Sequence, residues 1–380
     1  MVSVDEVRPA PVPVIEVKSA RQRLAQWDEH KGQVLAISVI GDSYSAGQDF
    51  YLNRLTQRLA KNFGFAGPGY IGFNHGAALG STNYKYTRSS EKYFGGDWAV
   101  SALGQASPDS RTLTGKAGAY LEVDASATPA INTSVAHARL LYLGNGEVNE
   151  LRYRWAASAT WHALALTGSG VQAVDLSDVP ASTDWALRFE VVKGAPTLFG
   201  LWMASDGGGV RVSKLAASGA ASADFFQRDS QWQTQWKTAV SKIPADVYLI
   251  MLGGNDQGVG VRPEDYLENM KGLVRMIREV HPAASINVIL RQDTTRSSAY
   301  PMSDYARKLE PWARSQSIGY WNLQCAFGPD FKRYASDGPT PMIRPDKIHP
   351  VPGTGGRLIA DFFYGLIAGE IKDGCPAAMQ

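Results

Sequence analysis

A chain of 380 residues is long for a single hydrophobic core, so its length predicts two domains or one domain with a large insertion. Apolar residues make up 44% of the sequence and charged residues 19%, and 38 basic residues nearly balance 36 acidic ones. This balance leaves no strong field to attract nucleic acid or anionic lipid, and no apolar run approaches the roughly 20 residues that a membrane-spanning helix needs. We therefore expect neither a nucleic-acid partner nor insertion into a membrane.

The first 32 residues predict an N-terminal arm. Prolines alternate with small apolar residues from Pro9 to Pro13, which is typical of an extended segment. The first 17 residues have neither the basic start nor the apolar run of a signal peptide. A chain from which a signal peptide had been removed would look the same, so this pattern leaves the compartment open.

A buried strand followed by a helix is predicted within residues 33–80. The run VLAISVI, residues 34–40, is mostly apolar and is typical of a buried strand. Leucines and a phenylalanine then recur at helical spacing, and a glycine suited to ending the helix follows them; these residues are Leu52, Leu55, Leu59, Phe63 and Gly64.

Residues 81–204 have a different pattern, which predicts an inserted antiparallel β-sandwich. Short runs with strand character are separated by turn-like segments; the runs are AYLEV, ARLLYL, LRYRWAA, WHALAL, WALRFEVV and TLFGLWM. Closely spaced strands without helical periods are typical of two packed antiparallel sheets. Five of the ten tryptophans fall here, where exposed rings could stack on sugars, although we expect core packing for most of them.

The alternation of strand and helix returns in residues 205–380. Strand-like runs cover 210–216, 246–252, 286–291 and 319–323. Helices are predicted through Trp232 and Trp236, from Pro263 to Val280, and over residues 357–371. With residues 34–40, these runs give five strands separated by helices, which is typical of a parallel sheet covered on both faces.

Small and polar residues follow several of these strands, where the ligand crevice of an open α/β sheet lies. Ser43 follows the first strand in GDS, Gly219 follows the second in AASGA, and Asn255 follows the third in GGND; DKIHP, before the last helix, holds Asp346 and His349. Ester hydrolysis through a covalent intermediate needs a nucleophile, a base, a group that orients the base, and donors for the oxyanion. We expect Ser43 to attack, His349 to act as the base, and Asp346 to orient it. The N–H groups of Ser43 and Gly219, with the Asn255 amide, are expected to bind the oxyanion.

Other residues beside these loops have simpler expected roles. Asp42 and Asp256 are expected to fix their loops by accepting backbone hydrogen bonds, and Ser45 to start a helix rather than to be a rival nucleophile. Tyr44 and Arg291 are candidates for contact with the substrate, and a surface or ion-paired side chain is the alternative for Arg291.

Histidines and cysteines give no sign of a metal site. No pair among the six histidines has the spacing or the carboxylate company of metal ligands, so we predict no metal ion. Cys325 and Cys375 are the two cysteines, and the sequence is compatible with one disulfide or with two free thiols.

The four blocks around Ser43, Gly219, Asn255 and His349 resemble those of the SGNH (GDSL-type) hydrolase family, which occur in this order. The resemblance covers residues 33–80 and 205–380 and implies a three-layer α/β fold around a parallel five-stranded sheet. Residues 81–204 would then be an inserted antiparallel β-sandwich, similar to a carbohydrate-binding domain. Tyr44 stands where GDSL enzymes have Leu, so the first block departs from its commonest form.

The long insertion and the phrase FGFAGPGYIGF are similar to two-domain bacterial O-acetylesterases that act on O-acetylated peptidoglycan. The resemblance implies a serine esterase that deacetylates a bacterial polysaccharide through an acetyl-Ser43 intermediate, without a cofactor. Its partner would be the acetylated glycan, which favours a periplasmic, secreted or virion-associated location. The same chemistry on capsule, O-antigen or xylan, including a phage-borne deacetylase, is one alternative. A non-catalytic glycan-binding module on a hydrolase fold is another, although no Ser, His or Asn of the set is missing. The oligomeric state stays open.

Overall fold

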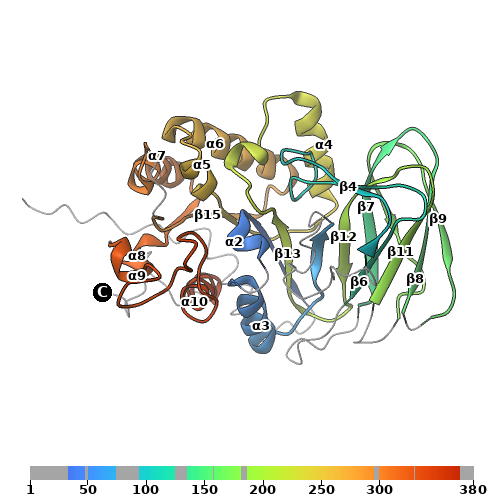
Figure 1. Cartoon of the computed structure of the whole chain (residues 1–380), viewed down its shortest axis with the longest axis horizontal. Helices are drawn as coiled ribbons and strands as arrows, with labels where there is room; N and C mark the ends of the chain where they lie inside the picture. Colours follow the sequence, from blue (N-terminus) through green and yellow to red (C-terminus); the bar gives the residue numbers. More distant parts are fainter. Residues whose placement is uncertain are drawn as a thin grey trace, which may run out of the picture.

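The computed structural model of the chain describes residues 33–47, 50–73, 94–124, 135–156, 158–180, 186–294, 299–328 and 330–368. The predicted arm, residues 1–32, and Cys375 lie outside these ranges. In the described part, helices surround one end of a long sheet, and a second sheet lies near its other end (Figure 1).

The five predicted parallel strands are present and adjacent. In spatial order they are β13 (Gly209–Ala216), β1 (Val34–Gly41), β14 (Val247–Met251), β15 (Ser285–Leu290) and β16 (Gly319–Asn322). Every neighbouring pair is parallel. β1 pairs with β13 over its whole length and with β14 from Ile37 to Gly41. The prediction of an α/β fold built on these strands is confirmed.

The sheet is mixed, whereas the sequence predicted a purely parallel one. Beyond β13 it continues through β2 (Gly69–Gly72), β12 (Thr197–Ala204), β7 (His137–Asn145) and β10 (Ser169–Asp175). The contacts from β2 to β10 are antiparallel, and β5 (Leu113–Gly115) and β4 (Trp98–Val100) extend from β12. The reason is that β2 joins both β12 and β13, so strands from residues 94–204 continue the central sheet.

A second, antiparallel sheet is formed by the other strands of this region. Its order is β3 (Phe94–Gly95), β6 (Tyr120–Asp124), β11 (Ala186–Lys193), β8 (Asn149–Trp155) and β9 (His162–Leu166). Side chains of both sheets share one apolar cluster, which includes Leu140, Leu201, Trp155 and Phe189. Trp155 is therefore a core residue, as expected for most tryptophans here, whereas Trp161 is partly exposed. That this region forms a separate inserted domain stays a prediction.

Helices cover both faces of the parallel strands (Figure 1). One apolar cluster joins the sheet to α4 (Ser230–Ser241), α6 (Pro263–Val280) and α7 (Met302–Ser315), and another joins it to α3 (Leu52–Phe63) and α10 (Gly355–Ala368). Short helical segments are α2 (Ser43–Ala46), η2 (Ser222–Asp224), α5 (Gly254–Gly258), α8 (Gln324–Phe327) and α9 (Phe331–Tyr334). The predicted bounds of α6 are confirmed, as is the end of α3 before Gly64.

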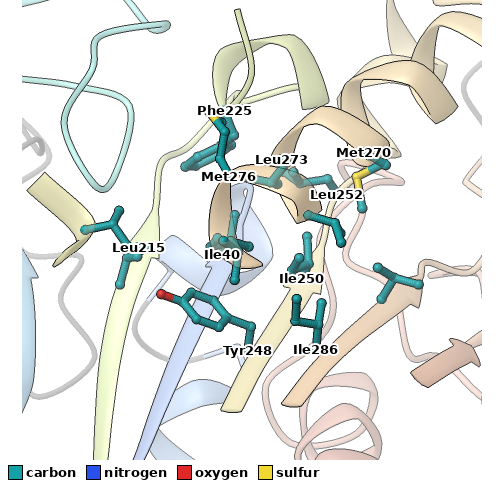
Figure 2. Packing of buried hydrophobic residues seen from close by; sticks show 14 of the residues in the cluster. Ile40, Leu215, Phe225, Tyr248, Ile250, Leu252, Met270, Leu273, Met276 and Ile286 are labelled. Atoms are coloured by element: carbon teal, nitrogen blue, oxygen red, sulfur yellow. The ribbon is translucent and has the colours of Figure 1, made fainter. Parts of the chain in front are cut away.

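Alternation along β1 divides its side chains between the two helical layers. Ile40 packs with Leu215 and Ile250 in the cluster below α6 (Figure 2), whereas Ile37 and Val39 belong to the cluster on the other face. Full burial of each such side chain stabilises the fold by roughly 1.5–3 kcal/mol. This packing fixes the end of β1, from which the nucleophile turn projects.

Two further features of the chain concern its environment. None of the helices within the described ranges is both long and apolar enough to cross a membrane. Cys325 is disulfide-bonded. Of the two alternatives for the cysteines, a disulfide therefore agrees with the structure and free thiols do not.

Candidate active site

Ser43 lies at a tight turn between β1 and α2. β1 ends at Gly41, and the side chain of Asp42 caps α2 by accepting a hydrogen bond of 2.9 Å from the Tyr44 N–H. A Cβ at Gly41 would lie 2.3 Å from the Oγ of Ser45, so only glycine fits there. Ser43 is thereby placed at the first position of a helix, at the carboxyl edge of the sheet and partly exposed.

The structure brings Ser43, His349 and Asp346 into one hydrogen-bonded chain. The Ser43 Oγ lies 2.9 Å from Nε2 of His349, and Nδ1 of His349 lies 2.8 Å from Oδ2 of Asp346. Because an ionised carboxylate only accepts hydrogen bonds, the proton of a neutral imidazole belongs on Nδ1 in this arrangement. Nε2 is then free to accept the Ser43 proton, as a general base must.

Asp346 is held as a carboxylate by its own loop. Its Oδ1 accepts hydrogen bonds of 2.9 Å from the N–H groups of Ile348 and His349. Partial burial raises the pKa of Asp346, but these two N–H groups and the His349 imidazole outweigh it and keep the pKa below its ordinary value. Asp346 therefore stays ionised and can stabilise a positive charge that forms on His349.

Aromatic side chains hold the imidazole in place. Phe50 stacks on His349, with 5.2 Å between ring centroids and 17° between planes. The hydroxyl of Tyr44 donates to the carbonyl of Ile348, one residue before His349, and accepts a hydrogen bond of 2.8 Å from Gln292. Tyr44 therefore links the nucleophile helix to the histidine loop.

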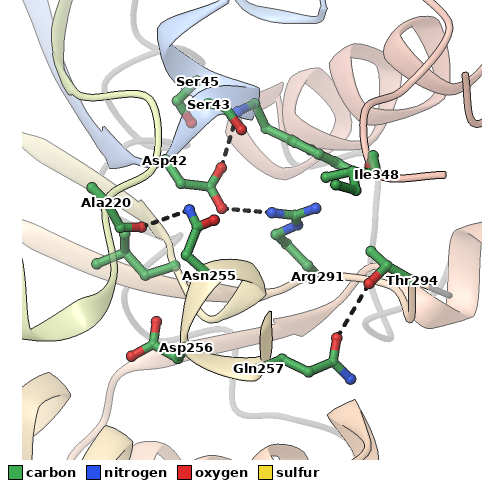
Figure 3. A network of polar contacts seen from close by, with 12 residues as sticks. Asp42, Ser43, Ser45, Ala220, Asn255, Asp256, Gln257, Arg291, Thr294 and Ile348 are labelled. Atoms are coloured by element: carbon green, nitrogen blue, oxygen red, sulfur yellow. Dashed lines mark hydrogen bonds and ion pairs between the residues drawn. The ribbon is translucent and has the colours of Figure 1, made fainter. Parts of the chain in front are cut away.

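Tyr44 and Arg291 do not line the surface of the site, contrary to the expectation that they contact the substrate. Tyr44 is 0% exposed and Arg291 is 1% exposed. Arg291 forms an ion pair with Asp42, 2.5 Å between Nη1 and Oδ2 (Figure 3). Its guanidinium carbon lies 3.5 Å from the Tyr44 ring centroid. The ion-paired alternative for Arg291 is therefore correct. Because both side chains are buried, they support the site from inside the protein and are not in a position to contact the substrate.

Two neighbouring loops present donors beside Ser43. Within the described ranges, the N–H groups of Ser43 and Gly219 have no hydrogen-bond acceptor. Gly219 has φ +86°, which favours glycine. The Nδ2 of Asn255 donates to the carbonyl of Ala220 at 2.9 Å, which leaves the second N–H of this amide available (Figure 3). These groups suit an oxyanion, which needs donors that are not already engaged.

Asp256 and Ser45 have the supporting roles expected of them. Asp256 accepts hydrogen bonds of 3.0–3.1 Å from the Ser222 N–H and one of 2.5 Å from its hydroxyl. Burial raises the pKa of Asp256 to about 6, although these hydrogen bonds lower it. Ser45 is fully buried, and its Oγ lies 2.7 Å from the Tyr51 hydroxyl, so it is not a rival nucleophile.

Sequence reasoning missed Phe50, Gln292 and Leu103 at this site. The Phe50 ring follows the first block by a few residues, but only the fold places it on His349. Leu103 comes from the loop after β4, and its Cδ1 lies 3.6 Å from where a Cβ of Gly219 would be. This loop is held by hydrogen bonds of 2.7–2.8 Å from Gln227 and Trp232 to the carbonyl of Gly104.

Within the described ranges, no group of three or more His, Cys, Asp and Glu side chains is placed to hold a metal ion. The chemistry that the arrangement itself offers is nucleophilic: a hydroxyl, a base oriented by a carboxylate, and unengaged donors.

Residues 184–352 match the model of the GDSL-like lipase/acylhydrolase family, so the Ser43 turn precedes the matched segment. Among solved structures, the chain is similar to one described as a peptidoglycan O-acetylesterase in action: the TM-score is 0.71 at 19% identity, over 93% of this chain and 95% of that one. At this identity the likeness shows the fold alone.

Two further solved structures are much less similar. A protein from Bacillus subtilis has a TM-score of 0.34 at 17% identity, over 76% of this chain and 92% of that one. A family two carbohydrate esterase from Cellvibrio japonicus has a TM-score of 0.30 at 12% identity, over 72% of this chain and 97% of that one. No curated protein matches the chain.

Proposed function

Because the chain carries a GDSL-like lipase/acylhydrolase domain, we propose that it is a serine esterase that removes O-acetyl groups from a bacterial polysaccharide, of the peptidoglycan type. The observation that carries the proposal is the chain of hydrogen bonds from Ser43 through His349 to Asp346, 2.9 and 2.8 Å long. The fold alone would not carry it, because one fold hosts many functions.

In the proposed reaction, the Ser43 Oγ attacks the acetyl carbonyl carbon while Nε2 of His349 takes the hydroxyl proton. The resulting oxyanion is bound by the N–H groups of Ser43 and Gly219 and by the Asn255 amide. When the intermediate collapses, the bond to the sugar oxygen breaks and His349 returns the proton to that oxygen. Water, deprotonated by His349, then attacks the carbonyl carbon of acetyl-Ser43. The bond to the Ser43 Oγ breaks, His349 returns the proton to this oxygen, and acetate leaves.

The antiparallel region, residues 81–204, is proposed to help hold the glycan. The partly exposed ring of Trp161 lies 4.5 Å and 5.0 Å from the guanidinium carbons of Arg152 and Arg154, on a sheet that does not carry the triad. Arg152 is paired with Glu190, so the partly exposed Trp161 ring and the Arg154 guanidinium are the groups proposed to contact a sugar. A polymeric glycan as substrate also favours a location outside the cytoplasm.

The proposal is tested by measuring acetate release from O-acetylated peptidoglycan, with acetylated xylan as the competing polymer and base-deacetylated peptidoglycan as the blank. We expect kcat/KM to be higher for peptidoglycan. A preference for xylan would support the proposed esterase activity but would replace peptidoglycan with xylan as the substrate. Binding to either polymer without turnover of any acetyl ester would instead support the glycan-binding alternative.

A further inference from the structure

Arg344 lies at the base of the loop that carries Asp346 and His349. Its N–H donates to the carbonyl of His349 at 2.7 Å, and its own carbonyl accepts a hydrogen bond of 2.8 Å from the Lys347 N–H. Ile343, one residue before it, forms a β-bridge with Pro350, one residue after His349. The loop is thus closed at its base, and this closure fixes the position of Arg344 relative to His349.

The side chain of Arg344 is directed to the same aromatic ring that contacts His349. Its guanidinium carbon lies 4.8 Å from the Phe50 ring centroid, and Phe50 stacks on His349 with centroids 5.2 Å apart. Arg344 is partly exposed. A partly exposed positive charge therefore lies one aromatic ring away from the proposed base.

Within the described ranges, Arg344 has no carboxylate within 4.0 Å, whereas Arg58, Arg152 and Arg262, among other arginines, pair with Asp or Glu. The nearest acid along its loop is Asp346, which is already engaged by two N–H groups and by His349. Contact with Phe50 leaves the planar edge of the guanidinium free to form paired hydrogen bonds, which carboxylates accept well.

We infer that Arg344 binds the carboxylate of the sugar that bears the acetyl ester, so that the preferred substrate is an acidic glycan whose muramic acid carboxyl carries no peptide. This inference rests on the proposed function and narrows its substrate class. A charge-assisted hydrogen bond to one carboxylate favours the charged substrate over a neutral analogue by roughly 10- to 100-fold.

The test compares two substrates that differ only in this charge: O-acetylated N-acetylmuramic acid and the methyl ester of its carboxyl group. For the wild-type protein we expect kcat/KM to be at least about tenfold higher for the acid, and this preference to shrink as NaCl is added. R344Q should bring the ratio of the two values close to one, whereas R344K, which keeps the charge, should retain part of it. R278Q, at the end of α6, removes an equal charge from a helix on one face of the sheet and should leave the wild-type ratio.

Two results would overturn the inference while the proposed function stands. One is an equal kcat/KM of the wild-type protein for the acid and its methyl ester. The other is an equal loss on both substrates in R344Q, which would mean that Arg344 only holds Phe50 against His349. Failure of the wild-type protein to release acetate from either sugar, or from 4-nitrophenyl acetate, would instead count against the proposed function itself.

Discussion

Arg291 and Asp42 form a buried ion pair, 2.5 Å between Nη1 and Oδ2, that joins the end of β15 to the residue before Ser43. Asp42 uses its other carboxylate oxygen to cap α2, so a single side chain connects the helix of the proposed nucleophile to the residue after β15, two strands away from β1. Both side chains are almost fully buried. The pair therefore fixes where Ser43 stands relative to the sheet.

Removing one partner of this pair should destabilise the protein strongly. In Arg291→Met, the Asp42 carboxylate stays buried without its counter-charge, and we expect the free energy of unfolding to fall by about 3–5 kcal/mol in urea titrations. The double variant Asp42→Asn with Arg291→Met should recover much of this loss, because no charge is left buried. Within the described ranges, Nε and Nη2 of Arg291 have no hydrogen-bond partner, so few further bonds are lost. Additive losses in the double variant would contradict this coupling.

Replacement of the proposed nucleophile or base should remove activity without unfolding the protein. Ser43→Ala and His349→Ala are each expected to lower kcat on 4-nitrophenyl acetate by several orders of magnitude, since the first removes the nucleophile and the second removes the base with both of its hydrogen bonds. Asn255→Ala should cost less, on the order of 10² to 10³ in kcat, because one oxyanion donor is lost while the nucleophile remains.

Urea titrations of the same three variants serve as the control for folding. Turnover as fast as that of the wild-type protein in Ser43→Ala or His349→Ala would refute the proposed triad. A change confined to KM in Asn255→Ala would make Asn255 a substrate-binding residue instead.

The parallel part of the fold could be predicted from the sequence because its signals are local. Apolar runs mark the five strands, and helical spacing with a terminal proline or glycine marks α3 and α6. Ser43 could be named in advance because it follows a buried strand, and Asp346 and His349 because DKIHP stands before the last helix, in the order of the family's blocks. By contrast, α7 carries Pro311 in its interior, and this conceals a helix from pattern reading.

The long-range contacts could not be predicted. β2 is four residues long, and nothing in GYIG says that it joins β12 to β13 and so makes the sheet continuous. Burial of Arg291 is equally hidden, because its partner Asp42 lies 249 residues away in the sequence. An arginine after a strand is more often at the surface, so its role depends on packing that only the structure reveals.

Asp256 should make stability depend on pH in the acid range. Its pKa is about 6 in the folded protein and lies near the ordinary 3.8 when the chain is unfolded. Between these values the folded state holds a proton that the unfolded state has lost, so its contribution to stability falls as pH rises from about 4 to about 6. The fall is on the order of 3 kcal/mol at most.

Asp256→Asn should remove this dependence, because an amide has no proton to lose in this range. Urea titrations at pH 4, 5, 6 and 7 should show the wild-type protein losing stability relative to the variant as pH rises, with the change complete near pH 7. Asp337→Asn, at an exposed position, changes charge equally and should show no such trend. A constant difference between wild type and Asp256→Asn across this range would refute the assignment.

The acyl pocket is expected to accept acetyl and to reject long chains. Gly219 and Asn255 beside Ser43 come from loops of small and polar residues, and the Tyr44 ring is buried below the site rather than lining it. Small and polar side chains cannot bury the methylenes of a long chain, which would each add roughly 0.8 kcal/mol to binding in an apolar trough. We therefore expect kcat/KM on 4-nitrophenyl esters to fall steeply from the two-carbon to the eight-carbon acyl group.

Leu103 offers a way to locate the end of this pocket. It is the apolar side chain whose Cδ1 lies 3.6 Å from the Cβ position of Gly219, so a longer acyl group bound at the oxyanion donors would meet it. Leu103→Ala should raise kcat/KM for the four-carbon ester relative to acetate, whereas Val259→Ala, at an exposed position on a neighbouring loop, should not. A wild-type profile that rises with chain length would overturn the polysaccharide substrate even if Ser43 proved to be the nucleophile, and would indicate a lipase or thioesterase.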